Sequence, residues 1–242
     1  MLKKIFCLFL LAGCAGTWWV APDNFLYVPV NTGEYEIATW QKINNPKNSR
    51  IHIYIEGDGN AFDSYGQPTD NPTPHGTLVR DLAVSDTFDN VVYMARPCQF
   101  IMSKSCSESD WTDGRFSQKI IDSESIVLQK IATNKKITLI GYSGGAMVSG
   151  LIIKQNPKLN FEKWITVAGV LNHKKWTDYF GDEPLIKSID MEILPDIAQK
   201  HFVGGRDNIV PPDLAKQWSK IEDIVIIDNA THDDFGKLKI FD

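Results

Sequence analysis

Short apolar runs alternate with amphipathic stretches over most of the chain. Residues 50–56 (Arg-Ile-His-Ile-Tyr-Ile-Glu) place apolar side chains at every second position and run into a glycine-rich loop, which predicts a strand. The same reasoning predicts further strands at 91–95, 137–140, 164–168, 201–203 and 224–227, and helices at 76–88, 117–133, 146–154 and 213–220. Strands that alternate with helices favour βαβ units, so we predict an α/β fold: a mostly parallel central sheet with helices on both faces, in a single domain.

Two segments depart from this alternation. Residues 27–43 are expected to hold one or two antiparallel strands that enter the sheet from one edge. Residues 169–197 form a long connection without clear regular structure, and it contains Trp176, Tyr179 and Phe180. We therefore treat 169–197 as a candidate cap or insert, whose aromatic side chains either line a pocket or cover the core.

The start of the chain carries an export pattern. Lys3 and Lys4 precede an apolar run at 5–12 that is too short to span a bilayer as a helix. The tetrapeptide at 11–14 (Leu-Ala-Gly-Cys) resembles the lipobox of bacterial lipoproteins, in which the cysteine is acylated and becomes the first mature residue. The alternative is an ordinary signal peptide with an incidental cysteine at position 14.

The lipobox resemblance implies a division of the chain and a location. Residues 1–13 are then a lipoprotein signal peptide, 14–26 a tether and 27–242 the folded domain, anchored to the cell envelope by lipid on Cys14. Ala15 follows the cysteine, and in a Gram-negative host this favours the outer membrane, facing the periplasm.

The composition of the chain limits the kinds of partner that it is expected to bind. Removal of residues 1–13 leaves 242 − 13 = 229 residues, with 25 − 2 = 23 basic against 30 acidic side chains, a length that suits one large domain. The acidic balance, without any cluster of Lys or Arg, argues against nucleic acid as a partner. Membrane association is therefore expected through the lipid anchor alone.

Two cysteines remain once Cys7 is removed with the signal and Cys14 carries lipid. Cys98 and Cys106 lie eight residues apart, and in an exported protein two such cysteines are expected to form a disulfide. The alternative, a catalytic thiol, has no neighbouring histidine in the sequence.

The motif that carries chemistry is Gly141-Tyr-Ser-Gly-Gly145, which fits G-x-S-x-G. It follows a predicted buried strand and opens a predicted helix, which is the context of a nucleophile elbow. A sharp strand-to-helix turn needs small residues two before and two after the serine, and glycine stands at both positions. The turn exposes the Ser143 hydroxyl above the carboxyl edge of the sheet and directs the Gly144 amide at a developing oxyanion.

With this elbow, the chain over about residues 27–242 resembles the α/β-hydrolase superfamily, whose order is Ser, then Asp or Glu, then His. Phe202-Val-Gly-Gly-Arg-Asp207 resembles the superfamily's acid loop, and Asn229-Ala-Thr-His232 its histidine loop, which lies after the last strand and before a final helix. The resemblance implies that His232 accepts the proton of Ser143 and that Asp207 orients the histidine.

Other residues compete for both supporting roles. The alternative acids are Asp178 and Asp182. The remaining histidines are His52 and His201 within predicted strands, His75 before the serine, and His173 in the long connection.

The second oxyanion donor should come from the loop after the strand at 50–56. Superfamily members often have His-Gly there, whereas this chain has Glu56-Gly-Asp58-Gly59, so the Asp58 amide is the first candidate and Gly59 the next. The two carboxylates would oppose an oxyanion unless they point away, and we expect them to hold the loop by hydrogen bonds. We also expect Arg96 to pair with Asp58 or Asp63 at the surface.

These residues together predict a serine hydrolase that cleaves a carboxylic ester or related acyl bond of a small-molecule or lipid substrate through an acyl-enzyme. No metal or organic cofactor is implied, because the three side chains supply nucleophile, base and charge stabilisation. The motifs Glu-Gly-Asp-Gly, Arg-Pro-Cys-Gln and Trp-Thr…Arg-Phe-Ser resemble a group of uncharacterised bacterial hydrolase-fold lipoproteins. The alternatives are a peptidase or amidase, and a binding or assembly lipoprotein that keeps the fold without the chemistry.

Overall fold

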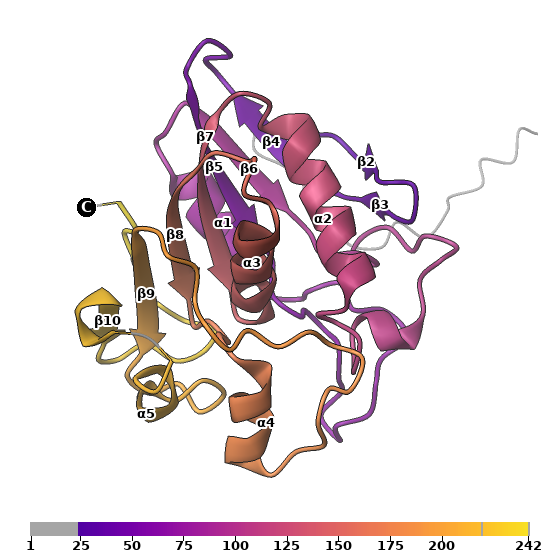
Figure 1. The fold of residues 1–242 in the computed structure, drawn as a ribbon, viewed down its shortest axis with the longest axis vertical. Helices are drawn as coiled ribbons and strands as arrows, with labels where there is room; N and C mark the ends of the chain where they lie inside the picture. The colour runs from indigo at the N-terminus through magenta and orange to yellow at the C-terminus, as the bar shows by residue number, and fades with distance from the viewer. Residues whose placement is uncertain (1–23, 219, 242) are drawn as a thin grey trace, which may run out of the picture.

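The computed structural model describes residues 24–218 and 220–241. The predicted signal peptide, the lipid-accepting Cys14 and most of the predicted tether lie outside these described residues. The centre of the molecule is an eight-stranded sheet in the order β1-β4-β6-β5-β7-β8-β9-β10 (Figure 1). Its strands are β1 (Leu26–Tyr27), β4 (Thr39–Ile43), β5 (Arg50–Ile55), β6 (Asn90–Met94), β7 (Lys136–Tyr142), β8 (Phe161–Val167), β9 (Gln199–Gly204) and β10 (Ile224–Ile227).

Parallel pairing runs without a break from β6 through β5, β7, β8 and β9 to β10. At the other edge β4 pairs antiparallel with β6, and β1 pairs antiparallel with β4. The short strands β2 (Val30–Asn31) and β3 (Glu36–Ile37) form a separate two-stranded sheet. The predicted mostly parallel sheet, with antiparallel strands from 27–43 at one edge, is confirmed.

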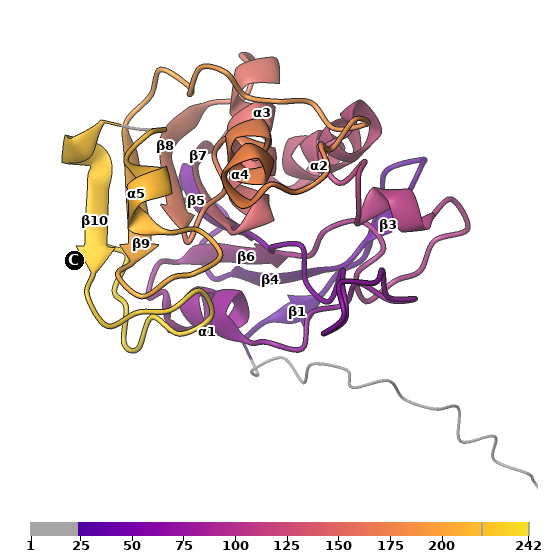
Figure 2. The ribbon, with the colours of Figure 1, turned by 90° about the horizontal axis from the view of Figure 1, so that it is seen from below.

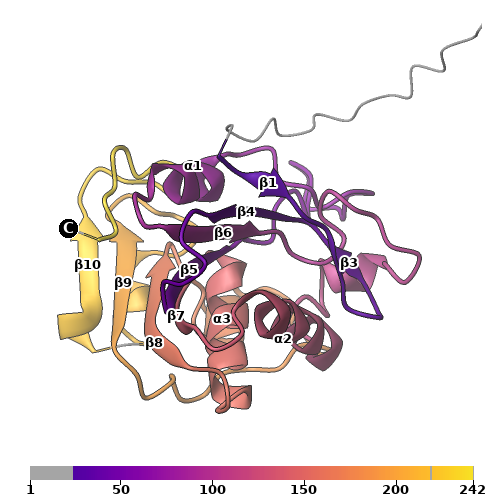
Figure 3. The same ribbon diagram turned by 90° about the horizontal axis from the view of Figure 1, so that it is seen from above.

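Helices cover both faces of the sheet, as predicted. The helices α2 (Gln118–Ile131) and α3 (Gly144–Gln155) lie against one face, and α1 (Leu78–Ser85) lies against the other (Figure 2, Figure 3). The alternation within β5 explains this division, because Ile51, Ile53 and Ile55 belong to the core under α2 and α3, whereas Tyr54 belongs to the core under α1. Residues of one strand thus stabilise two separate apolar layers.

The connection at 169–197 contains a helix that its sequence pattern did not reveal. Helix α4 (His173–Phe180) begins after Asn172, whose side chain accepts a hydrogen bond from the Lys175 amide, and ends at Gly181 with φ 72°. The rest of the connection is irregular but packs on the core, since Met191 is 1% exposed and lies against Gly150 of α3.

Two helices near the C-terminus differ from expectation. The helix predicted at 213–220 is reduced to α5 (Pro212–Ala215). The final helix expected after His232 is absent, because no residue from 228 to 241 is helical. In that segment Phe235 and Ile240 insert into the core under α1 while Gly236 adopts φ 57°, a path that a regular helix would not allow.

The predicted disulfide between Cys98 and Cys106 is present, with a Cα–Cα distance of 5.8 Å. Short 3₁₀ turns, η1 (Glu108–Asp110) and η2 (Ile221–Asp223), complete the regular structure of the described part of the chain. No helix within that part has the length and apolar character needed to cross a bilayer.

Candidate active site

The turn between β7 and α3 holds Ser143 in a strained backbone conformation. Its φ is 49° and its ψ −122°, values that residues with side chains rarely adopt. A Cβ atom at Gly141 would lie 2.5 Å from the Gly145 carbonyl oxygen, and a Cβ atom at Gly145 would overlap the Glu56 carbonyl oxygen. The turn therefore closes only because both flanking positions are glycine.

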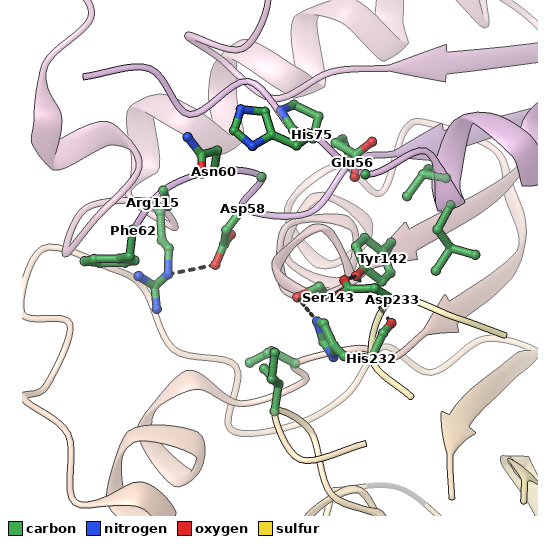
Figure 4. Close-up of a pocket in the computed structure, with 18 of the residues that line it drawn as sticks. Glu56, Asp58, Asn60, Phe62, His75, Arg115, Tyr142, Ser143, His232 and Asp233 are labelled. Carbon is green, nitrogen blue, oxygen red and sulfur yellow. Dashed lines mark hydrogen bonds and ion pairs between the residues drawn. The ribbon is translucent and has the colours of Figure 1, made fainter. Parts of the chain in front are cut away.

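Three side chains from three different strand ends meet at this turn. Ser143 Oγ lies 2.9 Å from His232 Nε2, and His232 Nδ1 lies 2.9 Å from Asp207 Oδ2 (Figure 4). The other carboxylate oxygen of Asp207 accepts hydrogen bonds from the amides of Ile209 and Val210, both at 2.8 Å. Asp207 is 4% exposed and His232 is 7% exposed, so water competes little for these contacts.

This arrangement suits proton transfer from a serine hydroxyl to a histidine. A carboxylate at Nδ1 fixes the ring orientation and stabilises the imidazolium that forms when Nε2 accepts the proton. The backbone amides on Asp207 hold the carboxylate in place, so the ring has one preferred position.

The other candidate histidines lie elsewhere. His52 Nδ1 contacts Asp86 at 2.7 Å, and His201 Nδ1 contacts Thr166 at 2.9 Å. Burial lowers the pKa of His201 to about 4, which keeps its ring neutral. His173 stacks on Phe116, and only His75 shares the cavity of Ser143, where the described contacts include none between the two.

Neither alternative acid lies at the histidine. Asp178 pairs with Lys174 along the exposed side of α4, at 2.6 Å. Asp182 follows the C-terminal end of that helix at Gly181. The structure thus brings together Ser143, His232 and Asp207, and none of the alternatives.

The two candidate oxyanion donors are available. Among the hydrogen bonds of the described residues, none is donated by the backbone amide of Asp58 or of Gly144. Asp58 follows β5 and Gly144 begins α3, and the Asp58 carboxylate lies so close to Gly144 that a Cβ atom there would overlap it. Two backbone N–H groups without a partner among the described residues therefore lie near Ser143, one in the residue that follows it.

The carboxylate of Asp58 is held by two buried arginines. Its Oδ1 lies 3.2 Å from Arg96 Nη1, and its Oδ2 lies 3.1 Å from Arg115 Nε. Arg96 and Arg115 are 4% and 5% exposed, so the expected pair of Arg96 with Asp58 is present, but its arginine is buried and its carboxylate only partly exposed. Asp63 does not join it, because its Oδ1 accepts the backbone amides of Tyr65 and Gln67 instead. The two guanidiniums hold the carboxylate in place and offset its charge.

Glu56 also stabilises the loop after β5, as expected. Its two oxygens accept hydrogen bonds from the Gly57 amide at 2.9 Å and from the Tyr93 hydroxyl at 2.8 Å. The Gln99 side-chain amide donates to the Gly57 carbonyl at 2.9 Å, and Gln99 follows the disulfide-bonded Cys98. Burial raises the pKa of Glu56. The loop is thus fixed from both sides by side chains that the fold excludes from water.

Several residues of the site were not predicted as such. Arg115 and Gln99 lie in the noted motifs Trp-Thr…Arg-Phe-Ser and Arg-Pro-Cys-Gln, but those motifs gave them no role. Glu124 of α2 contacts Arg96 Nε at 2.8 Å and is fully buried, against the ordinary expectation for a glutamate on a helix. Tyr142 donates to Asp233 at 2.5 Å and thereby links the elbow to the histidine loop.

A cavity of about 510 Å³ opens over Ser143 and His232. Its lining includes Arg115 with the neighbouring rings of Phe62 and Trp176, and also Leu78, Val79 and Tyr142. The described residues include no group of three or more His, Cys, Asp or Glu side chains placed to hold a metal ion.

Comparisons with known proteins concern the fold. An esterase from Pyrococcus furiosus is 14% identical, with a TM-score of 0.58 over 86% of this chain and 82% of that one. A serine hydrolase from Xanthomonas campestris described as having no lid is 14% identical, with a TM-score of 0.55 over 88% of this chain and 87% of that one. The chain has the α/β-hydrolase fold.

The same fold relates the chain to an acylaminoacyl peptidase from Pyrococcus horikoshii, at 13% identity and a TM-score of 0.54 over 86% of this chain and 37% of that one. No protein-family model matches the sequence, and no curated protein matches it. The α/β-hydrolase fold hosts several chemistries, so function has to be argued from the site.

Proposed function

We propose that the protein is a serine hydrolase that cleaves a carboxylic ester or a related acyl bond through an acyl-enzyme. The observation that carries the proposal is the hydrogen-bonded chain from Ser143 Oγ through His232 to Asp207, at 2.9 Å for each contact. The free amides of Asp58 and Gly144 beside it support the same chemistry, since charge that develops on the carbonyl oxygen needs donors at that position.

The first half of the reaction forms the acyl-enzyme. Ser143 Oγ attacks the carbonyl carbon while His232 Nε2 accepts the hydroxyl proton, and the carbonyl oxygen becomes an oxyanion. When the tetrahedral intermediate collapses, the bond to the leaving oxygen breaks and His232 gives its proton to that oxygen. Asp207 remains ionised throughout and stabilises the charged ring.

The second half releases the acid. A water molecule gives its proton to His232 Nε2 and its oxygen attacks the acyl carbon, so that the acid leaves and the proton returns to Ser143. An amide would follow the same steps with nitrogen as the leaving atom. No contact of the described residues favours an amide over an ester, so the ester is the substrate that we test.

The decisive measurement is covalent labelling of the purified protein, without residues 1–13 and with Cys14→Ser, by a fluorophosphonate probe. We expect labelling of the native site, its loss in Ser143→Ala, and its retention in Ser64→Ala, which alters an exposed serine. His232→Ala should reduce the labelling rate by at least about 10³-fold, because removal of the base leaves the hydroxyl unactivated. A folded protein that takes up no probe would overturn the proposal and favour the non-catalytic alternative.

We further propose that the chain is a lipoprotein, anchored to a bacterial envelope membrane through acyl chains on Cys14. The support is the Leu-Ala-Gly-Cys tetrapeptide after a short apolar run, together with a disulfide of the kind that persists in oxidising compartments. Expression of the full chain with an alkynyl fatty acid should label it and place it in the membrane fraction. The Cys14→Ser variant should lose both properties, and fatty-acid label that survives Cys14→Ser would contradict the assignment.

A further inference from the structure

Arg115 is a buried cation in the wall of the cavity. It is 5% exposed, and it comes from the turn that precedes α2. Its Nε faces Asp58 at 3.1 Å and its Nη1 donates to the Thr112 carbonyl at 3.3 Å. Its Nη2 makes no hydrogen bond or ion pair with any described residue. A guanidinium holds five N–H donors, so Arg115 keeps donors for a bound group.

Aromatic rings surround this guanidinium. Its central carbon lies 5.9 Å from the ring centre of Phe62, 5.5 Å from that of Phe116 and 5.7 Å from that of Trp176. Such rings stabilise a cation without using its N–H groups, and they exclude water from its surroundings. In this environment a hydrogen bond between the guanidinium and an anion is stronger than in bulk water.

Few carboxylates contact the two buried guanidiniums directly. Asp58 is shared between Arg96 and Arg115, while Glu124 contacts only Arg96. Burial raises the pKa of Glu124 to about 7, so this carboxyl is about half protonated at neutral pH, and its Oε2 has no hydrogen-bond partner among the described residues. Asp58 is thus the one carboxylate among the described residues within ion-pair distance of Arg115, while Asp113 and Asp182 act on it only from further away. A bound anion at Arg115 would add a direct contact that these carboxylates do not make.

The position of Arg115 decides which part of a substrate would reach it. In Figure 4, Asp58 lies between Arg115 and Ser143, and His232 lies on the other side of Ser143. His232 protonates the leaving group, so the leaving group lies toward His232, which leaves the side of Ser143 toward Arg115 as a place for the acyl group.

We infer that Arg115 determines specificity by binding a carboxylate at the far end of the acyl group, so that the preferred substrates are half-esters of short dicarboxylic acids. The inference rests on the proposed function and deepens it. Asp58 remains paired with Arg96 and Arg115 when such a substrate binds, and the incoming carboxylate takes the Nη2 donors that the protein leaves free. Phe62 and Trp176 flank the methylene chain.

The test compares three ethyl esters of equal chain length: ethyl hydrogen glutarate, ethyl glutaramate and ethyl pentanoate. The half-ester and the glutaramate are nearly isosteric and differ in charge. We expect kcat/KM for the half-ester to exceed that for the glutaramate by about tenfold or more, the size of effect typical of hydrogen bonds to charged groups. Succinate and adipate pairs then measure the distance between the carboxylate site and Ser143.

Variants separate recognition from structural support. Arg115→Gln should reduce the ratio of half-ester to glutaramate to about one, and Arg115→Lys should keep part of it. Lys104→Gln, which removes an exposed cation, should leave the ratio unchanged. If the variant only disturbed the site by losing the contact to Asp58, kcat/KM would fall equally for the half-ester and the glutaramate, and their ratio would not change. Should the Arg115 variants fail to fold, free glutarate should still inhibit hydrolysis of ethyl pentanoate by the native protein more strongly than free pentanoate does.

The outcomes distinguish this inference from the function on which it rests. Hydrolysis of ethyl pentanoate or ethyl glutaramate without preference for the half-ester overturns the role of Arg115 and leaves the serine hydrolase standing. An unchanged ratio in a folded Arg115→Gln protein also overturns it. Absence of both hydrolysis and fluorophosphonate labelling instead overturns the proposed function.

Discussion

Substitution at position 143 tests whether the elbow stores backbone strain. Ser143 has φ 49° and ψ −122°, which glycine adopts freely and alanine does not. The comparison is therefore between Ser143→Gly and Ser143→Ala. Both variants lose the hydroxyl that contacts His232 at 2.9 Å, so the effect of that hydrogen bond cancels between them.

Two opposing effects set the magnitude. A residue with a Cβ atom in this region costs about 1–3 kcal/mol of strain in the folded state. Glycine costs about 0.4–1 kcal/mol relative to alanine, because its unfolded chain has more conformations to lose. The difference predicts that the glycine variant has the higher free energy of unfolding, by about 1 kcal/mol.

The assay is equilibrium unfolding in guanidinium chloride, with the midpoint and slope measured for both variants. Ser64 is the matched control, since it is exposed and its φ is not positive. At position 64 alanine should be the more stable residue by about 0.4–1 kcal/mol. An alanine variant at 143 that matches or exceeds the glycine variant would refute the claim that the turn strains its central residue.

Three further predictions concern stability. Gly145→Ala should destabilise the protein by more than about 3 kcal/mol or prevent folding, because the added Cβ atom meets the carbonyl oxygens of Ile55 and Glu56. Gly76→Ala is the control: it has open space around it and should change the free energy of unfolding by less than about 0.5 kcal/mol. The folded-state pKa of Glu124 is raised to about 7, so its contribution to the free energy of unfolding is present below pH 4.5 and is lost as the pH rises toward 7. The free energy of unfolding of the native protein should therefore fall by about 3 kcal/mol more over this range than that of Glu124→Gln. Equal pH profiles for the two proteins would contradict the prediction. Replacing Cys98 and Cys106 together by alanine should lower the free energy of unfolding by about 2.5 kcal/mol, because the disulfide closes a loop with a sequence separation of 8; reduction of the native protein should give a similar loss.

The sequence predicted the sheet well because its strands are buried on both faces. Strands such as β5 and β7 are short, β-branched and bounded by glycine or polar residues, which distinguishes them from helices without tertiary information. Helix α4 was not predicted, because few aliphatic residues stand at helical spacing in its sequence, His-Lys-Lys-Trp-Thr-Asp-Tyr-Phe. Its end signals, Asn172 and Gly181, were nevertheless readable.

The residues of the candidate site also fall into two groups, those that the sequence predicts and those that it does not. Ser143, Asp207 and His232 could be selected because each follows a strand that the apolar pattern predicts, and parallel strands bring their carboxyl ends to one edge. The contacts of Arg115 and Glu124 could not be predicted, because a charged residue near or within an amphipathic helix is ordinarily assigned to solvent. Only the folded chain shows that both side chains are buried, Glu124 against Arg96 and Arg115 against Asp58.

The order of site residues along the chain has a consequence for folding. Ser143 and His232 are separated by 89 positions, and the histidine follows β10, which adds to the sheet only by pairing with β9. Contacts between such distant positions form late, because closing a long loop costs entropy before any contact offsets it. A folding chain that has formed β7 and α3 but not β10 carries the strained serine without a partner for its proton. Proton transfer from Ser143 to His232 therefore becomes possible only once β10 has paired with β9, wherever the chain folds.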